Sequence, residues 1–298
     1  MKRILLFLVT NILIMAALSV TYHLICAYIG PEAMSEFSAY GINFGTIAVF
    51  ALVFGMGGAF ISLLLSKPIA KLSVGAQVVD GTENNQTRWL VDTVSQLAER
   101  ANIKTPEVAI YNGSANAFAT GAFKNSALVA VSSDIMEQMT REELRAVLAH
   151  EISHIANGDM VTMTLLQGVL NAVVLFLSRV IAFVAARAGG RDDDRRGFSH
   201  MTYYLVYYVM QITLGLLASI LVCAYSRKRE YAADAGSANL IGSPSSMIAA
   251  LRRLGNLQEG VLPDSLKAMG ISGKRKAVQL FSTHPSLEDR IDALSRVM

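Results

Sequence analysis

The chain alternates between long apolar runs and stretches in which apolar and polar residues are mixed. A bilayer-spanning helix needs about 20 predominantly apolar residues. Four runs reach that length, namely residues 4–28, 41–65, 160–186 and 203–225. We therefore expect a mainly α integral membrane protein with two N-terminal transmembrane helices, two further hydrophobic helices, and an α+β domain with a small β-sheet formed by the mixed stretches.

The first pair of runs predicts a membrane anchor and its orientation. A cleavable signal peptide is the alternative for residues 4–28, but the length of the run and the second run behind it favour a retained anchor. The loop 30–40 holds no Lys or Arg, whereas Lys2, Arg3 and Lys67 flank the outer ends. The positive-inside rule therefore places the N-terminus and the chain after residue 65 in the cytoplasm.

The second pair of runs leaves two alternatives open. Polar residues interrupt them, and such groups are costly in lipid unless they face protein or water: Gln167, Asn171, Arg179 and Gln211. The arginine-bearing linker 187–200 would also lie outside if both runs crossed, against the charge bias. The runs either cross fully or form a helical hairpin that does not. We divide the chain into 1–66, 67–159, 160–226 and 227–298.

The mixed stretches predict short elements around a small sheet. The apolar spacing and turn residues indicate helices over 87–101, 140–159 and 244–254, a last helix capped by Ser286, and strands over 107–111, 116–120 and 127–132. Residues 258–276 are expected to form a loop. The strand residues Asn116, Ala117, Phe118 and Ala119 could bind an extended peptide at an exposed edge, or be an ordinary sheet edge.

The predicted helix 140–159 carries the candidate chemistry. Thr140 and Glu143 form a capping-box pattern that indicates its start. In His150-Glu151-x-x-His154, two imidazoles four residues apart lie on one helical face and can bind one metal ion. The intervening carboxylate of Glu151 is then placed to take a proton from a water that zinc activates, which is the chemistry of peptide hydrolysis.

Two histidines leave a catalytic zinc site one protein ligand short. A metzincin site would need Gly at position 157 and His at 160, where the chain has Asn157 and Met160. Downstream, Glu230 and Asp234 follow the last apolar run at helical spacing. One of these carboxylates could bind the metal while the other braces a ligand imidazole.

Composition supports this outline and excludes other classes. The chain has 298 residues, 53% of them hydrophobic and only 16% charged, with a mean hydropathy of +0.42. A net charge of +3 without a basic face indicates no nucleic-acid partner. Cys26 and Cys223 lie in apolar runs, which argues against a disulfide framework or a thiolate metal site.

Together these motifs resemble the HtpX family of bacterial membrane heat-shock zinc metalloproteases, Glu-zincins related to the CAAX prenyl proteases. The resemblance rests on residues 150–154, Glu230 with Asp234, the four apolar runs, residues 116–119 and Thr283-His-Pro-Ser286. It covers essentially the whole chain, and no motif residue departs from the pattern.

The resemblance implies a role for each motif residue. His150, His154 and Glu230 would hold one Zn²⁺ per chain, Glu151 would be the base, and Asp234 would support a ligand from behind. His284 would contact the substrate or the developing oxyanion, although a lone histidine is more often a structural residue; Arg290 could orient it.

The resemblance also implies partners and a location. These are polypeptide substrates, chiefly misfolded membrane proteins, together with the lipid bilayer and membrane quality-control machinery, at the bacterial inner membrane with a cytoplasmic active site. The alternative from a different class is a membrane transporter or scaffold with a structural zinc, which would need four protein ligands.

Overall fold

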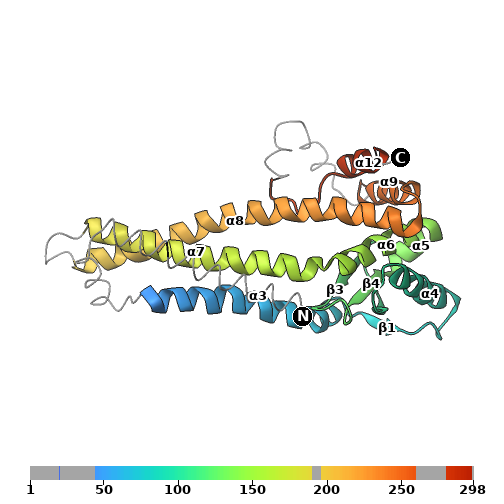
Figure 1. Ribbon diagram of the computed structural model, residues 1–298, viewed down its shortest axis with the longest axis horizontal. Coiled ribbons are helices and arrows are strands. Elements are labelled where there is room, and N and C mark those ends of the chain that lie inside the picture. Colours follow the sequence, from blue (N-terminus) through green and yellow to red (C-terminus); the bar gives the residue numbers. More distant parts are fainter. Residues whose placement is uncertain (1–19, 21–43, 190–195, 260–279, 297–298) are drawn as a thin grey trace. The chain divides into compact units, whose positions relative to one another are not determined.

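Figure 1 shows the computed structural model, which describes residues 20, 44–189, 196–259 and 280–296. Two compact units form. Residues up to Ser62 and Met163–Val222 make the first, here called the helical unit, and Leu63–Thr162 with Cys223–Met298 make the second, here called the sheet unit. The predicted span 4–28, Cys26 and most of the predicted loop 258–276 lie outside the described residues.

Three long helices carry the apolar runs. They are α3 (Phe44–Val74), α7 (Asp159–Gly189) and α8 (Arg196–Ile241). Each contains a stretch long and apolar enough to cross a membrane, namely Ile47–Val74, Asp159–Ala186 and His200–Ile241. The prediction of apolar helices over the last three runs is confirmed, but α7 continues to Gly189 and α8 begins at Arg196, so both helices reach into the predicted linker 187–200.

Within the helical unit, α3 and α7 pack closely at glycines. A Cβ built on Gly55 would lie 2.5 Å from the backbone nitrogen of Ala172, so only glycine permits this contact. The same test finds no heavy atom of the described chain within 4 Å at Gly57 or Gly58. Of these three glycines of α3, Gly55 alone marks a close helix contact in the described chain.

Polar side chains in these helices find partners inside the helical unit. Gln167 donates a hydrogen bond to Asn171 at 2.8 Å. The Arg179 guanidinium lies 4.3 Å from the ring centroid of Phe50 and 5.4 Å from that of Tyr207, within the range of cation–π attraction. Gln167 and Asn171 therefore pair along α7, whereas Arg179 faces aromatic rings of α3 and α8.

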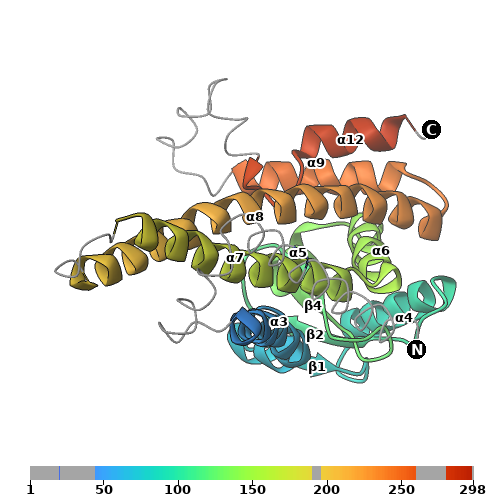
Figure 2. The same cartoon turned by 60° about the vertical axis from the view of Figure 1, so that its left-hand side comes forward.

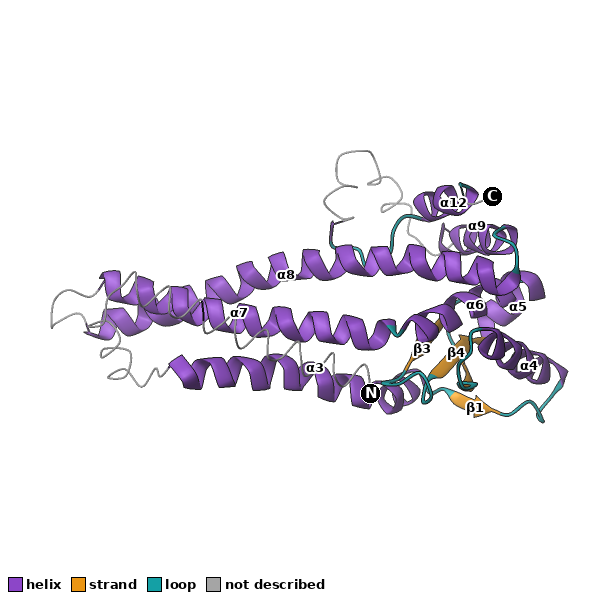
Figure 3. Ribbon diagram, viewed as in Figure 1, coloured by secondary structure: helices purple, strands orange, loops and turns teal. Residues whose placement is uncertain are grey.

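The sheet unit contains one four-stranded mixed sheet, coloured orange in Figure 3. Its strands are β1 (Gln77–Val79), β2 (Glu107–Tyr111), β3 (Ala117–Thr120) and β4 (Leu128–Ser132), in the order β1-β2-β4-β3. β2 and β4 are parallel, and both outer pairs are antiparallel. The three predicted strands are confirmed, and the three-residue β1 is an addition too short for a periodicity to reveal.

Five further helices of the described residues lie wholly in the sheet unit. They are α4 (Asn85–Arg100), α5 (Ser133–Gln138), α6 (Arg141–Asn157), α9 (Ser245–Glu259) and α12 (Leu287–Ser295). α6 is central, since it packs against β3, β4, α4 and α9, and α12 lies along α9 (Figure 2). Fully buried Leu148 and Ile152 of α6 face Leu90 and Leu251 in this core.

The ends of α6 are set by local chemistry. The Thr140 hydroxyl accepts a hydrogen bond from the Glu143 amide at 3.2 Å, and the Glu143 carboxylate accepts one from the Thr140 amide at 2.8 Å. This confirms the predicted capping box. Gly158 ends the helix with φ 73°, a left-handed conformation that glycine adopts without steric cost.

Candidate metal centre

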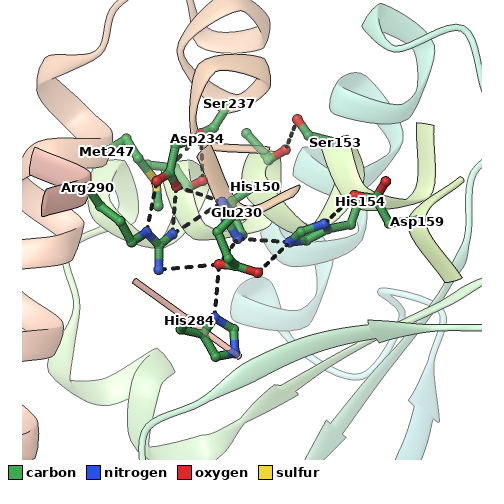
Figure 4. A network of polar contacts seen from close by, with 12 residues as sticks. His150, Ser153, His154, Asp159, Glu230, Asp234, Ser237, Met247, His284 and Arg290 are labelled. Atoms are coloured by element: carbon green, nitrogen blue, oxygen red, sulfur yellow. Dashed lines mark hydrogen bonds and ion pairs between the residues drawn. The ribbon is translucent and has the colours of Figure 1, made fainter. Parts of the chain in front are cut away.

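The two motif histidines meet on one face of α6. Their rings lie 4.7 Å apart between centroids, and their Nε2 atoms are separated by 3.1 Å. His150 is buried, and His154 is nearly so. The four-residue spacing on a capped helix therefore turns both ring nitrogens toward a common point, as Figure 4 shows.

Glu230 of α8 supplies a carboxylate at the same point. Its Oε2 lies 3.5 Å from His150 Nε2, and its Oε1 lies 3.4 Å from His154 Nε2. Ligand atoms held at about 2.0 to 2.1 Å from a tetrahedral zinc ion are themselves about 3.3 Å apart. The observed separations of 3.1, 3.4 and 3.5 Å, the last two to different oxygens of Glu230, are close to this spacing, and the three groups could hold one metal ion.

The remaining nitrogen of each ring contacts an aspartate. His150 Nδ1 lies 2.9 Å from Asp234 Oδ1, and His154 Nδ1 lies 2.7 Å from Asp159 Oδ2. A carboxylate at Nδ1 favours the tautomer in which that nitrogen carries the proton. Each Nε2 then has its lone pair free to coordinate a metal.

Arginines stand behind both aspartates. Arg290 of α12 donates two hydrogen bonds to Asp234, from Nε to Oδ2 at 2.8 Å and from Nη2 to Oδ1 at 2.6 Å. Arg229 of α8 forms an ion pair with Asp159. Such pairing offsets the cost of burying two carboxylates away from water.

α8 reaches α6 because small residues line the crossing. A Cβ built on Gly236 would lie 2.6 Å from the Ser153 hydroxyl, so this position has no room for a larger residue. One residue further, the Ser237 hydroxyl donates to the backbone oxygen of Ala146 at 2.9 Å. Together these contacts hold Glu230 and Asp234 at the histidines.

The polar environment favours a cation. Burial alone would lower the pKa of the His154 imidazole, but Asp159 and Glu230 outweigh it and raise the pKa to about 10. The same carboxylates that stabilise a proton on the imidazole would stabilise a metal ion beside it. The donor set of two imidazoles and one carboxylate also suits zinc.

Glu151 lies beside the cluster and near the edge strand. Burial raises the pKa of its carboxyl group, and the charges of His150 and His154 partly oppose this effect. The backbone amide of Ala119 in β3 hydrogen-bonds to the same carboxyl group. A carboxyl group of raised pKa next to a metal position can both accept and return a proton.

His284 is exposed but in contact with the cluster. Its Nδ1 lies 2.9 Å from Glu230 Oε2, and 64% of its side chain is accessible to solvent. Arg290 Nη1 lies 3.5 Å from the same carboxylate oxygen. The motif residues that the sequence predicted in α6, in α8, in α12 and just before α12 therefore lie together in the structure.

Sequence reasoning missed Asp159, Arg229 and Gly236. Asp159 is the last residue of the predicted helix 140–159, and its position five residues after His154 and directly after Gly158 is a usable signal. Arg229 directly precedes Glu230, but its partner is seventy positions away. The role of Gly236 depends on which residue of α6 it meets, which a single sequence does not show.

Comparisons with known proteins agree with this geometry. The model of peptidase family M48 matches residues 84–298. "Protease HtpX homolog" of Janthinobacterium sp. (strain Marseille) is 50% identical over 294 residues, covering 99% of each chain. The protein of the same name from Verminephrobacter eiseniae (strain EF01-2) is 52% identical over 294 residues, covering 99% of this chain and 98% of that one.

A solved structure shares the fold. The crystal structure of S. mikatae Ste24p aligns with a TM-score of 0.61 and 18% sequence identity, covering 97% of this chain and 67% of that chain. The fold class expected from the sequence is therefore confirmed. The alternative of a structural zinc is not favoured, because the ligand group found among the described residues has three members and not four.

The family resemblance inferred from the motifs is likewise confirmed. A family match over most of the chain, close relatives along its whole length and a metal-binding cluster of the right donors all agree. The chain belongs to peptidase family M48 and is a membrane-bound, zinc-dependent metalloendopeptidase.

Proposed function

We propose that this protein cleaves misfolded or damaged membrane and membrane-proximal proteins at the cytoplasmic face of the bacterial inner membrane. His150, His154 and Glu230 hold the zinc ion in this proposal. The observation that carries it is the tetrahedral spacing of these three ligand groups beside the buried carboxyl group of Glu151.

Bound zinc supplies Lewis acidity, which lowers the pKa of a coordinated water and polarises the scissile carbonyl. Glu151 accepts the proton of the attacking water and returns it to the leaving amine, as its raised pKa allows. Asp234 holds the His150 ring in the tautomer whose Nε2 faces the metal.

The free edge of β3 presents the substrate. Among the described residues, β3 lies at the end of the sheet with β4 as its single partner strand, so one row of its backbone groups has no described strand beside it. The Ser132 amide donates to the Asn116 carbonyl. Because hydrogen-bonded and non-hydrogen-bonded residues alternate in an antiparallel pair, the backbone N–H and C=O groups of Ala117 and Ala119 point away from β4. A peptide added along Asn116, Ala117, Phe118 and Ala119 would pass Glu151, whose carboxyl group bonds the Ala119 amide.

His284 and Arg290 act on the substrate side of the cluster. His284 reaches Glu230 while most of its side chain remains open to solvent, so a bound peptide can contact it. As a hydrogen-bond donor there it would stabilise the negative charge that develops on the carbonyl oxygen. Arg290 contributes through Glu230 and Asp234, which it contacts.

The position of Glu230 supports a membrane substrate. It lies five residues beyond the apolar run 203–225 on the same helix, which is about 7.5 Å along the helix axis. Basic residues gather where the apolar runs end, at Lys67, Lys71 and positions 227–229. The positive-inside rule then places this end, and the metal centre with it, in the cytoplasm.

The full-length protein in detergent, assayed on an unfolded polypeptide, tests the reaction. Chelation of zinc should abolish cleavage, and zinc re-addition should restore it. Glu151→Gln should slow cleavage about 10²- to 10⁴-fold, the usual contribution of a general base, with zinc still bound. Glu142→Gln, an exposed position on the same helix, is the matched control. Full activity of Glu151→Gln would contradict the mechanism.

Substrate and sidedness need separate measurements. In proteoliposomes, a misfolded reporter with a transmembrane anchor should be cleaved faster than the same reporter without it. Equal rates would argue against a membrane substrate. A fluorescent protein fused after Met298 should fluoresce in cells while alkaline phosphatase at the same position stays inactive. The opposite result would place the active site outside the cytoplasm.

A further inference from the structure

The two zinc-facing histidines are braced from different parts of the chain. Asp234, which braces His150, lies one helical turn after Glu230 on α8. Asp159, which braces His154, is the first residue of α7 and follows the left-handed Gly158. His154 is therefore braced by a residue in the turn directly after α6, outside the His150-Glu151-x-x-His154 motif.

The turn at Gly158 explains how Asp159 reaches His154. The Gly158 amide donates to the carbonyls of His154 and Ile155 at 3.0 and 3.1 Å, which ends α6. Its φ of 73° redirects the chain so that α7 begins at once. Asp159 then places Oδ2 at 2.7 Å from His154 Nδ1, with its side chain 6% accessible.

Arg229 completes this side and ties it to the third ligand. Its guanidinium pairs with Asp159 Oδ1, the oxygen not used by His154. Arg229 precedes Glu230 in α8, so neighbouring residues anchor the brace and supply the carboxylate of the cluster. Without Arg229, the Asp159 carboxylate would lose the ion pair that holds its second oxygen in place.

We propose that Asp159 and Arg229 are positioning residues that hold His154 in its metal-binding tautomer and orientation, and so raise the affinity of the site for zinc. The inference rests on the proposed role of His154 as a zinc ligand. The partner of a ligand imidazole commonly changes metal affinity by about 10- to 100-fold. A simple salt bridge between α7 and α8 would stabilise the fold and leave zinc affinity unchanged.

Zinc affinity measured by competition with a chromophoric chelator separates these roles. The full-length protein would carry Glu151→Gln throughout, so that self-cleavage cannot interfere and no activity is needed as a readout. Thermal unfolding of each metal-free variant reports its stability independently. Asp134→Ala, also in the first turn of a helix, is the control for Asp159. Arg252→Met, at an exposed position of α9, is the control for Arg229.

We expect Asp159→Ala to weaken zinc binding by about 10- to 100-fold. Asp159→Asn should weaken it less, because the amide oxygen still accepts a hydrogen bond from Nδ1. Arg229→Met should have an intermediate effect that Arg229→Lys partly restores. In the Asp159→Ala background, Arg229→Met should have no further effect on zinc affinity, since its target is absent.

Two results would overturn the inference in different ways. If the Glu151→Gln parent binds zinc but Asp159→Ala and Asp159→Asn bind it with the same affinity, Asp159 is no positioning residue and the proposed function is untouched. If the parent binds no zinc, the proposed function fails and the inference with it. Should Asp159→Ala not fold, Asp159→Asn with an unchanged unfolding temperature decides the question.

Discussion

The sheet unit and the helical unit use the same apolar residues in opposite ways. In the sheet unit, Leu90, Leu148 and Leu251 are fully buried around α6. In the helical unit, Leu216 and Leu221 of α8 are 54% and 57% accessible, and only 6% of the apolar window of α8 is buried. Large apolar side chains that stay exposed over a long helix identify lipid as the surroundings of the helical unit.

The polar groups differ as well. In the sheet unit, buried charges are concentrated in one network that links two arginines, three carboxylates and two histidines. In the helical unit, Arg179 is met by aromatic rings, and close contact at Gly55 holds α3 and α7 together. The sheet unit is thus stabilised by water-driven burial and the helical unit by close packing.

The largest expected effect is at the metal centre. Glu230→Ala removes one of three ligands. Structural sites of four ligands bind zinc with about 10 to 16 kcal/mol in total, so the loss of one ligand's share should weaken zinc binding by more than about 100-fold. Glu142→Ala, an exposed acid on α6, should leave the zinc content unchanged. Metal analysis of both purified proteins measures this, and unchanged zinc in Glu230→Ala would require a different third ligand.

The next effect tests the contrast in exposure directly. Leu216→Lys places a charge near the middle of the apolar run of α8 and should oppose membrane insertion by about 3 kcal/mol. Val78→Lys in β1, also half exposed, should change stability by less than about 0.5 kcal/mol. The readouts are the alkali-resistant membrane fraction and the unfolding temperature. Two equally tolerated substitutions would remove the distinction between the units.

The smallest effect concerns packing inside the helical unit. Gly55→Leu should destabilise the α3–α7 contact by about 1 to 3 kcal/mol, as overpacking does, since its Cβ would collide with the Ala172 backbone. Gly57→Leu is the matched control, because open space was found at that position. Thermal unfolding in detergent should show a lowered melting temperature for Gly55→Leu and an unchanged one for Gly57→Leu. Equal shifts would show that the glycines are interchangeable.

Local signals predicted much of this arrangement. The capping box of Thr140 and Glu143, the breaker at Gly158 and the four-residue spacing of His150 and His154 each act within one or two helical turns, so the sequence displays them. The sequence predicted Glu230 as a candidate because catalytic zinc needs a third ligand and because Glu230 and Asp234 follow the last apolar run four residues apart.

The remainder depends on contacts between distant residues. Nothing near Arg229 in the chain shows that it faces Asp159, seventy positions earlier, and Gly236 gains its meaning only from Ser153. The parallel pairing of β2 with β4, which leaves β3 on the outer side of β4, likewise depends on the fold of the whole unit. Local periodicity identifies elements, whereas which faces meet is decided by packing.

A zinc-edge anomalous difference map of the full-length Glu151→Gln protein tests the central claim most directly. We predict a single strong peak within bonding distance of His150 Nε2, His154 Nε2 and a carboxylate oxygen of Glu230, with no fourth protein ligand. A peak elsewhere, or one enclosed by four protein ligands, would contradict the account of this site as a catalytic zinc centre.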